Sequence, residues 1–240
     1  MPLLYNHPRA DLAHAATTAS SAFVATYQVA WHGITAGESV LTLSTEPSGT
    51  FTYSSNIKAH GIFRLVFPDA LIQSSTFTLN DGHVAPVQYQ ESGQARDHSD
   101  DVNLIFDRGS GRVHGTAETH AVDQPLDGGI QDPMSVQIEL MRQLQAGLAP
   151  TQFKLFDKDQ AKEYFYTRER SEVLTTPLGE METVVYRSDR PGSDRVTRLW
   201  LAPKLNYLPL QAARSRKGSV DLSMRIIGVS YPTPTVTATH

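Results

Sequence analysis

The chain has no cysteine among its 240 residues. Disulfide bonds, thiol nucleophiles and cysteine-ligated metals are therefore excluded. A chain of this length can bury a sizeable core without cross-links. The absence of cysteine is compatible with the cytosol, and equally with periplasmic proteins that avoid unwanted disulfide pairing.

Long apolar runs and strong net charge are also missing. No stretch approaches the ~20 consecutive apolar residues of a membrane-spanning helix, so we expect a protein that is not transmembrane. The formal net charge is -4, which provides no general attraction to nucleic acid. We therefore expect no nucleic-acid partner.

Motifs that would identify an enzyme are absent from the sequence. It contains no Gly-x-Ser-x-Gly and no glycine-rich phosphate loop. Most acidic residues fall in predicted turns, so no carboxylate pair stands out for glycosidase chemistry. Glu118 and His120 have a spacing that could chelate a cation, but two groups alone do not define a site. We predict no catalytic residues, no metal site and no cofactor.

The pattern that is present from Phe23 onward is an alternation of apolar and polar residues. Phe23, Tyr27, Val29 and Trp31 fall on one face of a predicted strand. The same alternation continues through the chain, and Asn80-Asp81-Gly82 and Arg190-Pro191-Gly192-Ser193 are hairpin turn signals. Strands are predicted at 22–32, 37–45, 51–59, 71–79, 83–92, 102–107, 111–119, 151–157, 162–174, 180–188, 195–202, 207–215 and 219–229. Residues 121–131 read as irregular.

One helix is predicted, over residues 132–147. Asp132 can cap its free N–H groups, and Pro133 suits its first position. Gly147 is a typical left-handed residue at the end of a helix. Two apolar stripes predict that the sheet covers much of its surface; the first comprises Met134, Ile138, Met141 and Leu148, and the second Val136, Leu140 and Leu144.

These elements predict an all-β fold, mainly antiparallel. We expect a single strongly curved half-barrel or spiral sheet of about a dozen or more strands around one α-helix. The domain should span residues 22–230, between a flexible leader (1–21) and a flexible tail (231–240). Ala13-His14-Ala15 has the form of a signal-peptidase site, but residues 1–12 contain no apolar core of a signal peptide. A mature chain, a signal lying upstream and a polar leader remain alternatives.

Aromatic side chains are the main candidates for binding. We predict a ligand site from Tyr27, Trp31, Phe63, Arg198 and Trp200, brought together on a concave face. Arg198 and Trp200 share strand parity and should project from one face about 7 Å apart. An aromatic ring beside a guanidinium suits an anionic sugar or lipid head group. The alternative is that Trp200 is a core residue and that Arg198 pairs with a nearby acid.

Four local strings, taken together, resemble a bacterial family known as domain of unknown function 3108. They are an aromatic-rich strand from Phe23 followed by Gly33 and Gly37-Glu38, then Asp132-Pro133-Met134-Ser135, then Thr176-Pro177-Leu178-Gly179, and finally Leu199-Trp200-Leu201-Ala202-Pro203 with Tyr207-Leu208-Pro209. The resemblance covers roughly Phe23 to Val229. It implies an exported protein of Gram-negative bacteria with a fold similar to the curved sheets of lipoprotein carriers. No catalytic residues are established for that family.

The first functional hypothesis is a non-catalytic periplasmic protein that binds an apolar or glycan envelope component in its concave face. Its ligand would be a lipid, a lipopolysaccharide or a glycan. The second is a structural module for envelope assembly that recruits protein partners through exposed sheet edges. The third is a hydrolase with an unrecognised site.

Overall fold

Antiparallel strands make up most of the computed structural model, which describes residues 22–65, 69–93 and 97–232. The predicted leader, 1–21, and residues 233–240 of the predicted tail lie outside the described residues. The strands are β1 (Phe23–Trp31), β2 (Ile34–Thr45), β3 (Phe51–Ala59), β4 (Leu71–Asn80), β5 (His83–Ser92), β6 (Val102–Asp107), β7 (Arg112–Ala117), β8 (His120–Pro125), β9 (Gln152–Asp157), β10 (Gln160–Thr176), β11 (Gly179–Asp189), β12 (Arg195–Ala202), β13 (Leu208–Arg216) and β14 (Ser219–Ser230). Two short 3-10 helices, η1 (Gly61–Leu65) and η2 (Pro203–Leu205), and one α-helix, α1 (Ser135–Gln145), complete the described elements.

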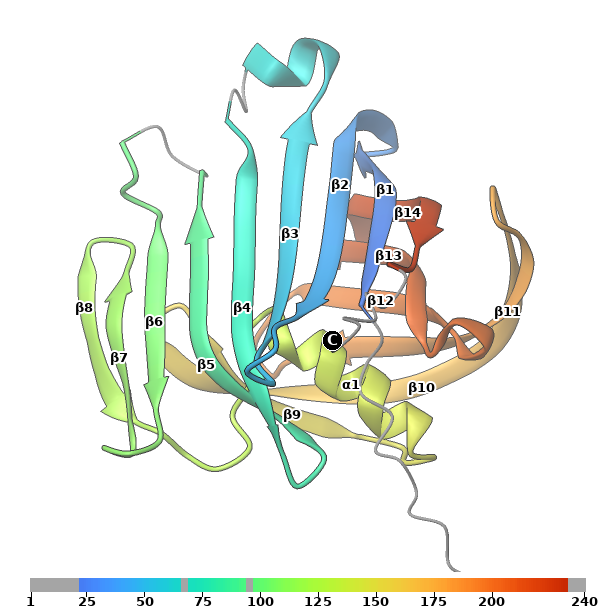
Figure 1. Cartoon of the computed structure of the whole chain (residues 1–240). Helices are drawn as coiled ribbons and strands as arrows, with labels where there is room; N and C mark the ends of the chain where they lie inside the picture. The colour runs from blue at the N-terminus through green and yellow to red at the C-terminus, as the bar shows by residue number, and fades with distance from the viewer. Residues whose placement is uncertain (1–21, 66–68, 94–96, 233–240) are drawn as a thin grey trace, which may run out of the picture.

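All these strands form one 14-stranded sheet in the order β8-β7-β6-β5-β4-β3-β2-β1-β14-β13-β12-β11-β10-β9. It consists of two meanders, β1–β8 and β9–β14, which are joined where the first and last strands pair. In Figure 1 the first meander forms the upright wall on the left, and the second runs behind it and to the right, with α1 between them. The predicted all-β fold, a curved antiparallel sheet around one helix, is confirmed.

Local sequence explains why successive strands pair as hairpins. Between β4 and β5, Asp81 has a φ of 51° and Gly82 a φ of 84°. Two consecutive positive φ values are the mark of the type I′ turn, whose twist matches that of the flanking strands. The Asn80-Asp81-Gly82 signal therefore predicts this hairpin correctly.

The helix separates two apolar cores. Met134, Ile138 and Met141 pack in a core that consists mainly of side chains of the first meander and also includes Phe156 and Leu210 of the second. Val136, Leu140 and Leu144 pack in a second core with Phe153, Tyr166 and Leu201 of the second meander. The two predicted stripes thus pack in different cores, and α1 lies between the two halves of the curved sheet.

The helix differs from the prediction at both ends. It begins at Ser135 and ends at Gln145. Asp132 still caps it from outside, because its Oδ1 accepts hydrogen bonds from the backbone N–H groups of Met134 and Ser135 at 2.8 and 2.7 Å. Gly147 has the expected positive φ of 74°. Leu148, assigned to the first stripe, is 54% exposed because it follows the last helical turn.

Two further expectations are corrected. Residues 121–125, in the stretch expected to be irregular, belong to edge strand β8, which pairs with β7. The strand predicted at 37–45 begins earlier, because β2 starts at Ile34 and the preceding turn consists of His32 and Gly33, both with positive φ. A Cβ at Gly37 would lie 2.2 Å from the carbonyl oxygen of Lys58, so glycine allows β3 to approach closely there.

Candidate functional site

The concave face of the sheet contains a hollow in two adjoining parts. The floor part, about 620 Å³, lies beside Pro133, Met134 and Gln137 at the start of α1. The mouth part, about 360 Å³, lies beside Trp31 and Phe63. The two parts share the lining residues Ile57, Leu71, Asp100, Arg214, Leu222 and Met224. We call the two parts together the concave hollow.

The mouth part has mainly apolar walls drawn from both ends of the chain. Ile57 comes from β3 and Leu71 from β4, while Leu222 and Met224 come from β14. The pairing of β1 with β14 brings these strands together, with Trp31 opposite Leu222 in the register. Period-two alternation then sends Trp31, Leu222 and Met224 toward the same space.

The floor part contains a hydrogen-bonded polar cluster. Gln73 Nε2 donates to Tyr89 Oη at 3.2 Å and to Glu91 Oε2 at 2.9 Å, and the Tyr89 hydroxyl donates to Glu91 Oε2 at 2.5 Å. Burial, and then the neighbouring Glu91 carboxylate, raise the pKa of Tyr89. The floor therefore offers oriented amide, hydroxyl and carboxylate groups beneath an apolar mouth.

Asp132 lies next to this floor and is completely buried. The Ser75 hydroxyl donates to Asp132 Oδ2 at 2.5 Å. Burial raises the pKa of Asp132 to about 6, although its hydrogen bonds from Ser75, Ser135 and Met134 act in the opposite direction. These contacts connect β4 with the start of α1, so the carboxylate has a structural role below the hollow.

The five residues predicted to bind a ligand do not converge on one site. Trp31, 36% exposed, and Phe63 both line the mouth of the concave hollow. Tyr27 is on the same strand as Trp31 but lies in the core, where its hydroxyl donates to the carbonyl of Pro209 at 2.8 Å. Burial raises the pKa of Tyr27.

Arg198 and Trp200 line a separate, shallow hollow of about 720 Å³. They lie on the same face of β12, as their parity predicts. Leu201 packs against α1 from the opposite face of this strand. Arg198 makes a bidentate ion pair with Glu169 at 2.8 and 3.0 Å, and it holds the pKa of Glu169 below its usual range. Trp200 is buried, and its indole N–H donates to Glu172.

Sequence reasoning does not identify the other walls of the concave hollow. Leu71, Gln73, Glu91, Leu222 and Met224 line it without belonging to any motif. Alternation indicates which residues share a face of one strand. It does not reveal that β1 and β14 pair, and that pairing brings Leu222 beside Trp31.

Among the described residues, no group of three or more His, Asp or Glu could hold a metal ion. Glu118, considered above as a chelating group with His120, forms an ion pair with Lys158 of the β9–β10 turn. No helix in the described part of the chain is long and apolar enough to cross a membrane.

A single antiparallel sheet that curves around one helix has a β-barrel-like architecture. The chain belongs to the family of proteins of unknown function DUF3108, whose model matches residues 26–225. This confirms the resemblance drawn from the sequence strings. No curated protein matches the chain.

Solved structures with similar folds include a β-barrel-like protein of domain of unknown function DUF1849 from Brucella abortus. It is 12% identical, with a TM-score of 0.57 over 89% of this chain and 98% of that one. A Bacteroides fragilis protein provisionally described as exported, with a YmcC-like fold, has a TM-score of 0.34 at 9% identity over 88% and 96% of the two chains. A provisionally described lipoprotein from Parabacteroides distasonis has a TM-score of 0.33 at 9% identity over 88% and 95%.

Proposed function

We propose that this protein is a non-catalytic protein of the cell envelope that binds the apolar chain of an envelope amphiphile in the concave hollow. The observation that supports the proposal most strongly is the apolar lining of the mouth part by Ile57, Leu71, Leu222 and Met224. Ligand sites are typically concave and mostly apolar, with a few convergent polar groups. The proposal includes a periplasmic location, which the family resemblance implies.

The two parts of the hollow suit different portions of an amphiphile. An acyl chain would replace water along the apolar mouth, where its burial is favourable in proportion to the area covered. The amide of Gln73 and the carboxylate of Glu91 lie deeper. A polar group of the ligand could form hydrogen bonds with them, with the amide as donor or acceptor and the carboxylate as acceptor. This division favours an amphiphile over a purely polar glycan.

The alternative of assembly through open sheet edges has less support. Edge strand β8 is only six residues long and ends in Pro125, which cannot donate to a neighbouring strand. At the other edge, Gln131 already pairs with β9, through its N–H to the carbonyl of Lys154 and its carbonyl to the N–H of Phe156, both at 2.8 Å. Both edges are thus partly protected.

Tryptophan fluorescence tests the proposal, because Trp31 borders the hollow whereas Trp200 lies in another one. The probe is 9,10-dibromostearate, whose bromine atoms quench an indole that they contact. We expect saturable quenching of the wild type and of Trp200→Phe, and its loss in Trp31→Phe. Absence of saturable quenching in the wild type would refute binding of an acyl chain.

A pair of substitutions on β14 tests the location of the site. Leu222→Arg places a charge in the mouth part, whereas Val220→Arg places the same charge on the same strand in the other hollow. We expect Leu222→Arg to weaken binding of dibromostearate about tenfold or more, since a charge replaces part of the apolar wall. Val220→Arg should bind as the wild type does. Equal binding by the two variants would place the acyl chain elsewhere.

A further inference from the structure

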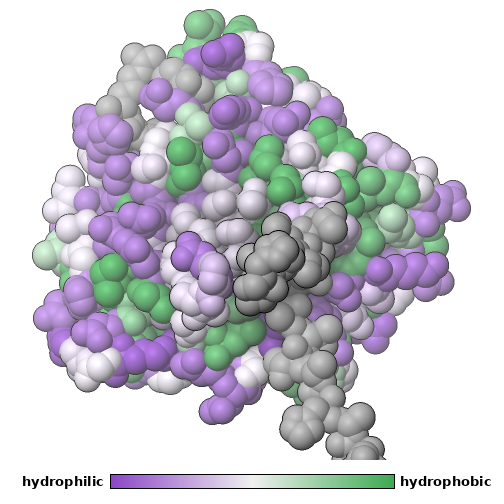
Figure 2. All heavy atoms as spheres, viewed as in Figure 1, coloured by the Kyte–Doolittle hydropathy of each residue, from purple (hydrophilic) through white to green (hydrophobic). Residues whose placement is uncertain are grey.

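The end of the molecule that carries η1 exposes large apolar side chains. Ile62 and Leu65 on η1 are 74% and 79% exposed, and Ile34 in neighbouring β2 is 63% exposed. None of the residues of η1 is buried. At the η1 end of Figure 2, hydrophobic and hydrophilic atoms lie side by side. We call Ile34, Ile62 and Leu65 the apolar rim.

The apolar rim does not contribute to the core, and so its composition is not explained by folding. The third large apolar residue of η1, Phe63, lines the mouth of the concave hollow. Its neighbours Ile62 and Leu65 remain in solvent, where apolar surface is unfavourable. Exposed apolar side chains gathered at one end of a molecule indicate an interaction site.

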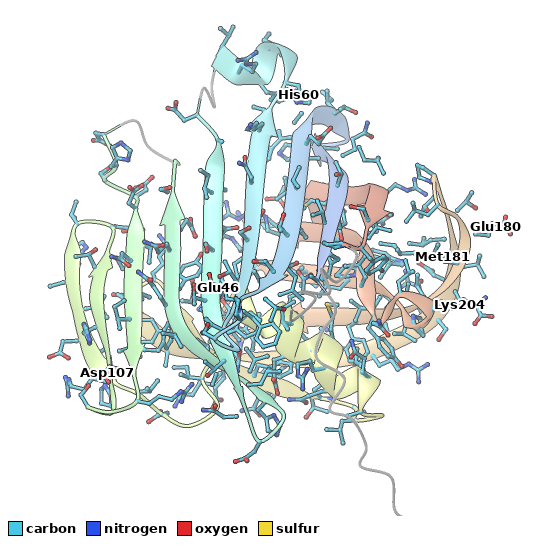
Figure 3. The ribbon with its side chains drawn as sticks, in the orientation of Figure 1. Glu46, His60, Asp107, Glu180, Met181 and Lys204 are labelled. Carbon is cyan, nitrogen blue, oxygen red and sulfur yellow. The ribbon has the colours of Figure 1, made fainter. Side chains whose placement is uncertain are left out.

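Two cationic side chains lie close to the apolar rim, Arg64 on η1 itself and Lys58 near the end of β3. Lys58 and Arg64 line a shallow depression together with His60 and one acid, Asp69. Neither Lys58 nor Arg64 makes an ion pair with another described residue, whereas Arg198 and Arg214 elsewhere are both paired. Figure 3 places His60 at the end of β3, where η1 begins. The local positive charge stands out because the chain has a net charge of -4.

Apolar side chains beside unpaired cations match the chemistry of a lipid surface with anionic head groups. Apolar residues enter the boundary between head groups and acyl chains, while Lys and Arg remain with the phosphates. We infer that the apolar rim, with Lys58 and Arg64, docks the protein on an anionic lipid surface. This docking goes beyond ligand binding in the concave hollow and does not require it.

The apolar rim adjoins the mouth of the concave hollow, so docking would bring the lipid surface to this mouth. Lys58 and Phe63 line the mouth part of the hollow and adjoin the rim residues. A lipid surface in contact with Ile62 and Leu65 would therefore face the open mouth. An apolar chain could pass between the lipid and the hollow without crossing bulk water.

Flotation with lipid vesicles tests the inference on the whole chain. The probes are vesicles of phosphatidylglycerol mixed with phosphatidylcholine, and vesicles of phosphatidylcholine alone. The wild type should float with the anionic vesicles and less with the neutral ones, and added salt should weaken its binding. Ile62→Asp/Leu65→Asp and Lys58→Glu/Arg64→Glu should each lower the affinity about tenfold or more.

Two controls distinguish docking through the apolar rim from a general effect of exposed apolar residues and from ligand binding in the hollow. Val173→Asp changes an apolar residue of β10 that is 57% exposed, and it should leave vesicle binding unchanged. Leu222→Asn, which removes an apolar wall of the hollow without adding charge at its mouth, should also float as the wild type does, so that a loss of ligand binding and a loss of docking can be told apart. All these positions are exposed or line the hollow, and thermal melting should confirm that each variant is folded.

Three results would overturn the inference. The first is a wild-type protein that does not float with anionic vesicles. The second is an Ile62→Asp/Leu65→Asp variant that floats as well as the wild type. The third is a dimer in light scattering that this variant converts to monomer while no form of the protein binds vesicles. That outcome would assign the apolar rim to self-association.

Discussion

Asp132 shows how one buried carboxyl group connects the helix to the sheet. It accepts hydrogen bonds from Ser75 on β4 and from two backbone N–H groups at the start of α1. Complete burial nevertheless raises its pKa to about 6. The folded protein therefore binds a proton at Asp132 more readily than the unfolded chain, in which an Asp titrates near ~3.9.

This difference predicts a pH dependence of stability. Below about pH 4 both states are protonated at Asp132, and the stabilising effect of its raised pKa is fully present. The effect is lost as the pH rises through about 6, the pKa in the folded state. Asp132→Asn keeps an oxygen acceptor for Met134 and Ser135 but cannot titrate.

Urea unfolding at several pH values measures the effect. We expect the stability of the wild type relative to Asp132→Asn to fall by about 2–3 kcal/mol between pH 4 and pH 7. Other carboxylates titrate in both proteins, so the difference between the two isolates Asp132. A difference that does not change with pH would show that burial does not shift the pKa of Asp132.

At the scale of elements, α1 fills the space between the two halves of the sheet. Its apolar side chains belong to two cores, one that draws on both meanders and one formed with the second meander alone. Glu139, buried on the same helix, accepts a hydrogen bond from the backbone N–H of Val84 at 2.7 Å and so fixes α1 to β5. The helix is therefore held by packing on two sides and by polar contacts at β4 and β5.

Truncation of single side chains tests this packing. Met141→Ala should lower the free energy of unfolding by about 2–5 kcal/mol, because Met141 is buried between helix and sheet. Leu148→Ala is the matched control, since Leu148 follows the helix and is 54% exposed. Its effect should stay within about 0.5 kcal/mol. Equal losses in thermal or denaturant unfolding would show that α1 does not fill the sheet.

The elements were predictable where local sequence decides them. Alternation identifies most strands, and Asp132, Pro133 and Gly147 delimit the helix to within a few residues. Local sequence does not predict β8, because Pro125 and the glycines after it suggest irregular structure, whereas pairing with β7 stabilises the strand. That pairing depends on where β7 lies, which the local sequence of residues 120–125 does not reveal.

The candidate site was less predictable than the elements. Trp31 and Phe63 line the concave hollow, and Arg198 and Trp200 line a different one on the other face of the sheet. Both tryptophans lie on strands with clear alternation, but parity within each strand does not indicate how the sheet curves between them. The order of the strands determines which faces meet, and this order depends on the pairing of β1 with β14.

At the scale of the whole molecule, the pairing of β1 with β14 in the middle of the sheet positions the walls of the concave hollow. It joins the two meanders beside the mouth of the hollow, so that Leu222 and Met224 line the same hollow as Ile57 and Leu71. The helix closes the floor, and η1 lies at the open end, visible at the top of Figure 1. From the floor of the concave hollow to its open end, the molecule thus presents polar groups, then apolar walls and then the apolar rim.

Native mass spectrometry of protein purified from its own envelope tests the central claim most directly. It would compare the wild type with Leu222→Arg, in which the mouth part is blocked, and with Val220→Arg as the matched control. The wild type and Val220→Arg should carry an additional mass that fits a molecule with an acyl chain, and Leu222→Arg should not. A wild-type protein without added mass, or a Leu222→Arg variant with the same added mass, would contradict ligand binding in the concave hollow.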